Sequence, residues 1–273
     1  MKALVLGAEG QLGAELVKLL GSDAGASRLE VSITDAAALD AVVAARRPAV
    51  VFNCAAYNAV DRAEAEPEVA FAVNATGPFN VASACVRHGA RFVHFSTNFV
   101  FDGAKMGAYV ESDLPSPLGV YARSKLEGER RVAEVMPEAL VMRTAAVFGG
   151  HRGQSFPERI LSRARAGSPL RVVSDQRVNP TYAADLATAA FHLAAAGEEG
   201  LVHAVSGECC GWDVFASAVL AEFELPLAVE KISTSDLAGG APRPSNGCLV
   251  STRISPLRSW RDGLHEWAAG ARD

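Results

Sequence analysis

Short apolar runs alternate with longer amphipathic segments from the N-terminus to about residue 195. The runs have the composition of buried strands, and the segments between them place apolar side chains on one helical face. Strands are predicted at 1–6, 49–54, 91–95, 139–142 and 201–206, and helices at 12–20, 36–45, 68–88, 121–135, 155–166, 181–196 and 212–223. This alternation predicts an α/β fold with a doubly wound parallel sheet of the Rossmann type.

A glycine-rich loop joins the first predicted strand to the first helix. Gly7, Gly10 and Gly13 lie in the order strand, loop, helix that a dinucleotide-binding fingerprint requires. Gly7 permits a tight turn, Gly10 lets the backbone approach a pyrophosphate, and Gly13 lets the helix pack on the sheet. Gln11 and Leu12 open the helix, whose free N–H groups favour phosphate. We favour cofactor binding over a plain glycine turn.

The stretch 21–32, where a second strand is expected, contains few strand-forming residues. An acid at its end would bind the ribose hydroxyls of NAD, but Ser27 and Arg28 stand there. This pair suits the 2′-phosphate of NADP, although Arg28 as a plain surface residue is an equally open interpretation. We expect NADPH as cofactor, with NADH as the alternative. Asp35 is predicted to cap the helix at 36–45 and is included among the cofactor-contacting residues.

The strand at 49–54 ends in the small residues Ala55 and Ala56, followed by Tyr57. In open α/β sheets, ligands bind beyond the carboxyl ends of the strands, and small residues there let a cofactor lie close. These three residues are therefore predicted to contact the cofactor.

Tyr121 and Lys125 are four residues apart at the start of a predicted helix, so their side chains share a face. A nearby ammonium favours the phenolate and lowers the pKa of the phenol, which in water is about 10. Such a pair suits a general acid that protonates a carbonyl oxygen as hydride arrives at its carbon. By itself the spacing is more often a surface pair. Thr97, at the carboxyl end of the strand 91–95, adds a hydroxyl that can hydrogen-bond the same carbonyl.

Several longer segments carry a more specific resemblance. The segments NCAAYNAVDRAEAEP (53–67), PSPLGVYARSKLEGE (115–129), DQRVNPTYAADLA (175–187) and APRPSN (241–246) resemble, in order, those of dTDP-4-dehydrorhamnose reductases. These belong to the extended short-chain dehydrogenase/reductase family. The resemblance covers nearly the whole chain. It implies catalytic roles for Thr97, Tyr121 and Lys125, and it adds Tyr121 and Lys125 to the cofactor-contacting residues.

The resemblance also implies a nucleotide-sugar pocket. The residues it assigns to that pocket are Asn58, Val60, Thr97, Asn98, Phe99, Ala146 and Arg243. Asn98 and Phe99 replace an Asp and a Tyr of the family pattern, and Ala146 replaces a tryptophan that would line the sugar pocket. Arg243 would pair with a diphosphate, with an ordinary loop arginine as the alternative.

The implied activity is reduction of a dTDP-linked 4-keto-6-deoxy sugar, most simply of dTDP-4-dehydro-L-rhamnose to dTDP-L-rhamnose. One alternative is a different nucleotide 4-keto sugar. Another is a non-catalytic regulatory subunit similar to that of methionine adenosyltransferase, which carries Asn at the place of Asn98. We expect an NADP-binding Rossmann domain from 1–148 plus 181–205 and a smaller substrate-binding lobe from 149–180 plus 206–273.

Composition and charge narrow the possible partners, location and metal content of the protein. The net charge is −5 and the longest basic runs are Arg pairs, which argues against nucleic acid as a partner. No signal segment and no apolar span of membrane length is apparent, so a cytoplasmic protein is expected, with a homodimer as one assembly. The five cysteines and six histidines show no metal-ligand spacing. We expect no metal site, reduced thiols, and incidental loop positions for Cys209 and Cys210.

Overall fold

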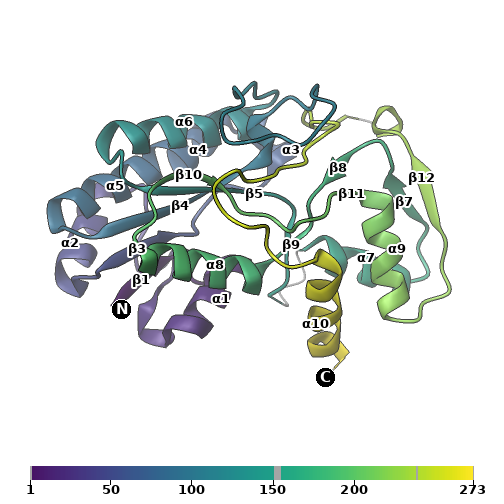
Figure 1. Cartoon of the computed structure of the whole chain (residues 1–273), viewed down its shortest axis with the longest axis horizontal. Coiled ribbons are helices and arrows are strands. Elements are labelled where there is room, and N and C mark those ends of the chain that lie inside the picture. The colour runs from purple at the N-terminus through teal and green to yellow at the C-terminus, as the bar shows by residue number, and fades with distance from the viewer. Residues whose placement is uncertain (1, 151–154, 238, 273) are drawn as a thin grey trace.

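A computed structural model describes residues 2–150, 155–237 and 239–272 (Figure 1). Its centre is a parallel six-stranded sheet with the order β10-β5-β4-β3-β1-β2. The strands are β1 (Ala3–Leu6), β2 (Gly25–Ala26), β3 (Val50–Asn53), β4 (Arg91–Thr97), β5 (Leu140–Thr144) and β10 (Gly200–His203). The predicted doubly wound sheet is confirmed. The weak second strand reduces to two residues, which pair with Val5 and Leu6.

Helices cover both faces of this sheet (Figure 1). One face carries α1 (Gln11–Leu20) and α8 (Ala183–Ala196), which pack on apolar strand residues such as Val5, Phe52 and Val93. The other carries α2 (Ala36–Arg46), α5 (Gly77–His88) and α6 (Val120–Val135). Because strand side chains alternate between the faces, each strand of this buried sheet is apolar on both sides, which is why the strands read as continuous apolar runs.

The helical stretch before β4 is continuous but changes its winding. It consists of α4 (Pro67–Phe71), a π-helical turn at Ala72–Thr76 and α5. The stretch 67–88 is long and apolar enough to span a membrane, but half of it is buried against the rest of the chain. A Cβ at Gly128 of α6 would lie 2.1 Å from the carbonyl oxygen of Asn74. The absence of a side chain at Gly128 therefore lets α6 dock directly on the π-helical turn.

A second cluster of apolar side chains lies beside the sheet, on the right of Figure 1. It forms around Phe215, Trp260 and Trp267, all fully buried. Its elements are α7 (Phe156–Arg165), β7 (Leu170–Val173), α9 (Trp212–Glu222), β12 (Val229–Ile232) and α10 (Trp260–Arg272). Two further two-stranded ladders join β6 (Val147–Phe148) to β9 (Thr181–Tyr182) and β8 (Arg177–Val178) to β11 (Cys210–Gly211). The exact division into 1–148 plus 181–205 and 149–180 plus 206–273 stays a prediction.

One expectation about the cysteines is wrong. Cys209 and Cys248 form a disulfide with their Cα atoms 5.8 Å apart. The two residues meet because β8 is flanked on one side by β11, which follows Cys209, and on the other by Asn246, which precedes Cys248. Spacing along the chain gives no sign of this meeting. Cys54, Cys85 and Cys210 are free thiols. Among the described residues, no cluster of His, Cys, Asp and Glu side chains is arranged to hold a metal ion.

Candidate active site

The carboxyl ends of β1 and β3 meet at the point where the strand order reverses. The strand β1 lies between β2 and β3, so the loops that follow β1 and β3 leave on opposite faces and open a crevice between them. Gly7 has a φ of +73°, and a Cβ there would lie 2.6 Å from the backbone nitrogen of Ala55. A Cβ at Gly13 would lie 2.2 Å from the carbonyl oxygen of Gly7. Both glycines are thus required by close backbone contact.

The start of α1 offers a site for a phosphate group. Gly10 is its N-cap and has no side chain to satisfy the first N–H groups, which belong to Gln11 and Leu12. Among the described residues, the buried Oε1 of Gln11 has no hydrogen-bond partner. A Cβ at Gly150 would lie 3.3 Å from Gln11 Cα, so the chain after β6 passes close by. Free N–H groups, the positive end of the helix dipole and a glycine cradle fit a dinucleotide pyrophosphate.

The residues predicted to select the cofactor lie just beyond β2. The Ser27 hydroxyl accepts a hydrogen bond from the backbone N–H of Glu30 at 3.3 Å. The Arg28 side chain is exposed and makes no hydrogen bond or ion pair within the described part of the chain. Asp35 caps α2 as expected, because its Oδ1 accepts from Ala38 N at 3.0 Å. Arg28 is therefore free to reach an anion at this edge of the site, while Asp35 already has a structural task.

Thr97, Tyr121 and Asn58 come together above the carboxyl end of β4. Thr97 is its last residue, Tyr121 is the second residue of α6, and both are buried. The Tyr121 hydroxyl lies 3.5 Å from Asn58 Oδ1, at the long limit of a hydrogen bond. Lys125, one helical turn further along α6, donates from Nζ to the Phe95 carbonyl oxygen at 2.6 Å. The sequence-predicted group is thus assembled in space, and its catalytic roles remain predictions.

The electrostatics of this group differ from the expectation. Burial raises the pKa of Tyr121, and a hydrogen bond with Thr97 opposes the rise. The prediction that this pKa is lowered is wrong for this structure, because burial outweighs the opposing effect. Burial lowers the pKa of Lys125 to about 8, against the opposing effect of Glu129. At neutral pH the phenol therefore holds its proton, and Lys125 is mostly cationic until the pH rises through about 8.

Asn74 links the loop after β3 to the catalytic helix. Its side chain accepts from Tyr57 N at 2.8 Å and donates to Tyr57 O and to Ser124 Oγ, each at 3.0 Å. Ser124 in turn donates to the Tyr121 carbonyl oxygen at 2.8 Å. Asn74 is buried in the π-helical turn, a distortion that often marks functional sites. Through these contacts Asn74 orders the start of the helix that carries Tyr121.

Asn98 and Phe99, two of the departures from the family pattern, have defined contacts. The buried Asn98 donates from Nδ2 to the Gly247 carbonyl oxygen at 3.0 Å, and a Cβ at Gly247 would lie 2.2 Å from that nitrogen. A carboxylate cannot donate this bond. Phe99 packs edge-on against the Tyr121 ring, with 5.8 Å between the ring centroids. Asn98 therefore ties the end of β4 to the segment that contains Gly247, and its contact with a substrate stays a prediction.

We expect Asn98→Asp to destabilise the protein at neutral pH. The carboxylate would face the Gly247 carbonyl with no donor, and an unsatisfied buried polar group costs about 1–3 kcal/mol. Urea unfolding of both proteins measures the difference. A protonated Asp regains a donor, so the gap between the two proteins should close as the pH falls. A gap that is absent at neutral pH, or that widens in acid, would contradict the role given to this bond.

The remaining predicted substrate residues lie in three other segments of the chain. Ala146 is half-buried with a φ of +40°, which is uncommon for a residue with a side chain. Its carbonyl accepts from Thr181 N at 3.2 Å. Val60 begins the short helix α3 (Val60–Ala63), two residues after Asn58. Arg243 donates from Nη2 to Asp61 Oδ2 at 2.9 Å, so the structure places the late loop beside the segment after β3.

A buried ion pair joins the catalytic helix α6 to strand β5, and neither of its residues was predicted to belong to the site. Glu129 accepts from both Arg143 Nε at 2.9 Å and Arg143 Nη2 at 2.7 Å, and also from Ser96 Oγ at 2.5 Å. It lies one turn beyond Lys125 and is buried, as is Arg143. The sequence offered one signal, the spacing of four between Lys125 and Glu129 on α6.

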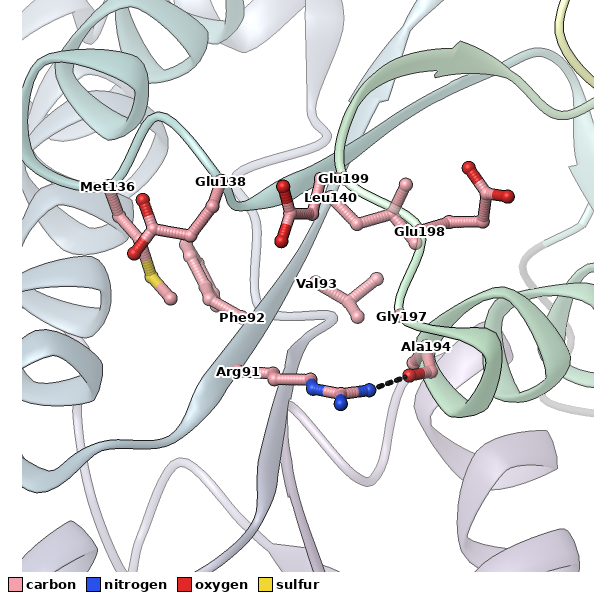
Figure 2. Close-up of a pocket in the computed structure, with 10 residues that line it drawn as sticks. All are labelled: Arg91, Phe92, Val93, Met136, Glu138, Leu140, Ala194, Gly197, Glu198 and Glu199. Atoms are coloured by element: carbon pink, nitrogen blue, oxygen red, sulfur yellow. Dashed lines mark hydrogen bonds between the residues drawn. The ribbon is translucent and has the colours of Figure 1, made fainter.

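A pocket elsewhere on the sheet lies away from this chemistry. Figure 2 shows it at the amino ends of β4, β5 and β10, with Arg91 donating to the Ala194 carbonyl oxygen at 2.7 Å. Glu138, Glu198 and Glu199 also line it. Thr97 and the end of β3 lie at the opposite, carboxyl edge of the same sheet. The pocket in Figure 2 is therefore not assigned to the predicted reaction.

Comparison with known proteins agrees with the geometry. Residues 1–272 match the family model described as the RmlD substrate binding domain. The dTDP-4-dehydrorhamnose reductase of Mycobacterium tuberculosis H37Rv is 42% identical over 279 residues, covering 96% of this chain and 91% of that protein.

Two solved structures are also similar. A dTDP-4-dehydrorhamnose reductase of Clostridium acetobutylicum superposes with a TM-score of 0.95 at 31% identity, covering all of both chains. That of Bacillus anthracis, in complex with NADP, has a TM-score of 0.94 at 30% identity, covering 99% of this chain and 100% of that one. With a family model matched along almost its whole length, the chain belongs to the dTDP-4-dehydrorhamnose reductase family.

Proposed function

We propose that the protein is an NADPH-dependent reductase of a dTDP-linked 4-keto-6-deoxy sugar, and specifically that it converts dTDP-4-dehydro-L-rhamnose to dTDP-L-rhamnose. The observation that carries the proposal is the position of the protonated Tyr121 hydroxyl. This hydroxyl lies close to Thr97 and Asn58, at the carboxyl edge of the sheet. The glycine loop lies at the same edge. The family and its full-length relatives support the same substrate class.

The cofactor would lie across the crevice between the loops that follow β1 and β3. Gly7 and Gly10 would leave room for the pyrophosphate, the N–H groups of Gln11 and Leu12 would bind its charge, and Ala55, Ala56 and Tyr57 would contact the cofactor on the β3 side. When bound, NADPH supplies the hydride. Lys125 is held by Phe95 O with its cationic charge directed toward the carboxyl end of β4, where it would bind the nicotinamide ribose.

The chain's own residues would handle the carbonyl. Thr97 would hold the C4 oxygen of the sugar, and Tyr121 would donate its proton to that oxygen as hydride arrives at C4. Burial raises the pKa of the phenol, so the acid carries its proton before the reaction begins. A phenol held protonated in a water-poor site acts as a general acid.

The deciding experiment is product analysis by NMR after incubation with NADPH and dTDP-4-dehydro-L-rhamnose. Formation of dTDP-L-rhamnose with loss of NADPH absorbance is the expected result. Turnover restricted to another nucleotide 4-keto sugar would retain the class and overturn the named substrate. If cofactor binds but no nucleotide sugar is reduced, the activity itself is rejected in favour of the regulatory-subunit interpretation.

A different 4-keto sugar is the second candidate, and the sugar end of the site is what favours it. Ala146 has too small a side chain to form a wall of the sugar pocket. Phe99, whose ring packs against that of Tyr121, has no hydroxyl to offer a sugar. A tryptophan contributes a large contact area, so its absence reshapes a pocket substantially. The assembled Thr97, Tyr121 and Lys125 count against a subunit without catalytic activity. A cytoplasmic location and a homodimer stay predictions.

Cofactor preference depends on Arg28. We expect steady-state kinetics to show NADPH preferred over NADH, because the free Arg28 guanidinium lies beyond β2 and can pair with the 2′-phosphate. Arg28→Ala should weaken NADPH binding about tenfold, the loss of one charge-assisted contact, and leave NADH unchanged. Arg47→Ala, at another exposed arginine, is the matched control. A wild-type preference for NADH would refute this assignment.

A further inference from the structure

Two carboxylates three residues apart contact two different parts of the site. Asp61 lies in the short helix α3, and Glu64 follows directly after it. Both residues are exposed, yet each makes its contacts far along the chain. Asp61 reaches the late loop 239–246, and Glu64 reaches the start of α6, the helix that carries Tyr121. The segment after β3 is thus joined to two distant parts of the chain.

Asp61 holds the late loop through backbone and side chain together. Its Oδ1 accepts from Ala241 N at 2.9 Å and its Oδ2 accepts from Arg243 Nη2 at 2.9 Å. Arg243 also donates from Nη1 to Ala241 O at 3.0 Å. A Cβ at Gly240, whose φ is +118°, would lie 3.1 Å from Asp61 Oδ1. The loop thus packs against this carboxylate, and a guanidinium with five donors keeps others free for a ligand.

Glu64 caps the catalytic helix from outside it. The N-cap of α6 is Gly119, which has no side chain for the task. Glu64 Oε1 accepts from Val120 N at 2.7 Å, and a Cβ at Gly119 would lie 2.7 Å from the same oxygen. The carboxylate satisfies one of the unpaired N–H groups and favours the positive end of the helix dipole. Tyr121 is the next residue, so the cap fixes the turn that carries the proposed acid.

We propose that Asp61 and Glu64 are positioning residues that place the two ends of the substrate relative to one another: Asp61 orients Arg243 toward the nucleotide diphosphate, and Glu64 fixes Tyr121 at the sugar carbonyl. The inference rests on the proposed function for the identity of the substrate. Its structural core is that one turn of chain after β3 anchors both the late loop and the catalytic helix. The adjacent Asn58, 3.5 Å from the Tyr121 hydroxyl, belongs to the same segment.

Kinetics separate the two roles. Asp61→Asn should raise KM for the nucleotide sugar about tenfold and leave kcat within about twofold, since a charge-assisted contact that orients Arg243 is lost. Glu64→Ala should lower kcat about tenfold with little change in KM, because small displacements of a reacting group are costly. Glu64→Gln keeps an acceptor oxygen and should restore most of kcat. Glu68→Gln, an exposed carboxylate on α4, is the matched control.

Two other kinetic outcomes would contradict the positioning roles. A lower KM in Asp61→Asn would mean that Asp61 competes with the diphosphate for Arg243, and the positioning role would be overturned. Equal losses of kcat and of sugar affinity in both variants would indicate general damage and also overturn it.

Hydrogen exchange of the NADPH-bound protein tests the same inference without turnover. Asp61→Asn should speed exchange in 239–246 and spare 119–124, and Glu64→Ala should do the reverse. If wild-type protein reduces no nucleotide sugar, the proposed function fails while this pattern still decides the positioning roles. Exchange unchanged in both segments, or raised equally in both by either variant, would overturn the inference.

Discussion

Replacing Tyr121 by Phe is expected to lower kcat by about 10²–10⁴-fold, the usual contribution of a positioned general acid. The substitution removes only the hydroxyl. The buried ring and its edge-on contact with Phe99 remain, so the protein should fold and bind NADPH as before. Loss of NADPH absorbance measures turnover, and fluorescence titration measures cofactor affinity.

Tyr182→Phe is the matched control, since it deletes a phenol oxygen in the β9 ladder, away from the end of β4. The control should keep wild-type turnover. Because burial raises the pKa of Tyr121, the phenol is protonated at and around neutral pH, and the deficit of Tyr121→Phe should persist across that range. Near wild-type turnover in Tyr121→Phe would assign the proton donor to another group.

The parts of the site that depend on neighbours in the sequence were predictable. Gly7 turns the loop with a φ of +73°, Gly13 packs on Gly7 within the same strand-loop-helix unit, and Asp35 caps the helix that follows it. The four-residue spacing of Tyr121 and Lys125 places both on one face of α6. In each case a local geometric rule connects the residue type to its structural task, and the alternation of apolar runs was enough to order these units into a sheet.

The contacts that join distant segments were not predictable from spacing. Asn98 bonds to Gly247, and Glu64 caps a helix that begins at Val120. No periodicity specifies such pairs, because they form only after distant segments of the chain have packed together. The electrostatic error has the same origin. Sharing a helix face with Lys125 suggested a lowered pKa for Tyr121, but burial of the phenol raises it.

The largest expected loss of stability follows from breaking the buried pair of Glu129 and Arg143. Their side chains are 10% and 3% exposed, and the guanidinium binds the carboxylate through two nitrogens. Arg143→Met would leave Glu129 buried without its counter-charge. Removing one partner of such a pair costs about 3–5 kcal/mol, a large part of a typical unfolding free energy of about 5–15 kcal/mol.

The same helix provides the control. Glu127 and Arg131 form an ion pair four residues apart with side chains 31% and 38% exposed. Arg131→Met should cost only about 0.3–0.5 kcal/mol, because water screens the pair. Denaturant unfolding compares the two variants. In Arg143→Met with Glu129→Gln, the neutral amide still accepts from Ser96 and no carboxylate is buried without its guanidinium, so much of the loss should be regained. An equal loss of unfolding free energy in Arg143→Met and Arg131→Met would show that solvent reaches the Glu129 carboxylate. Burial would then not explain the lowered pKa of the neighbouring Lys125.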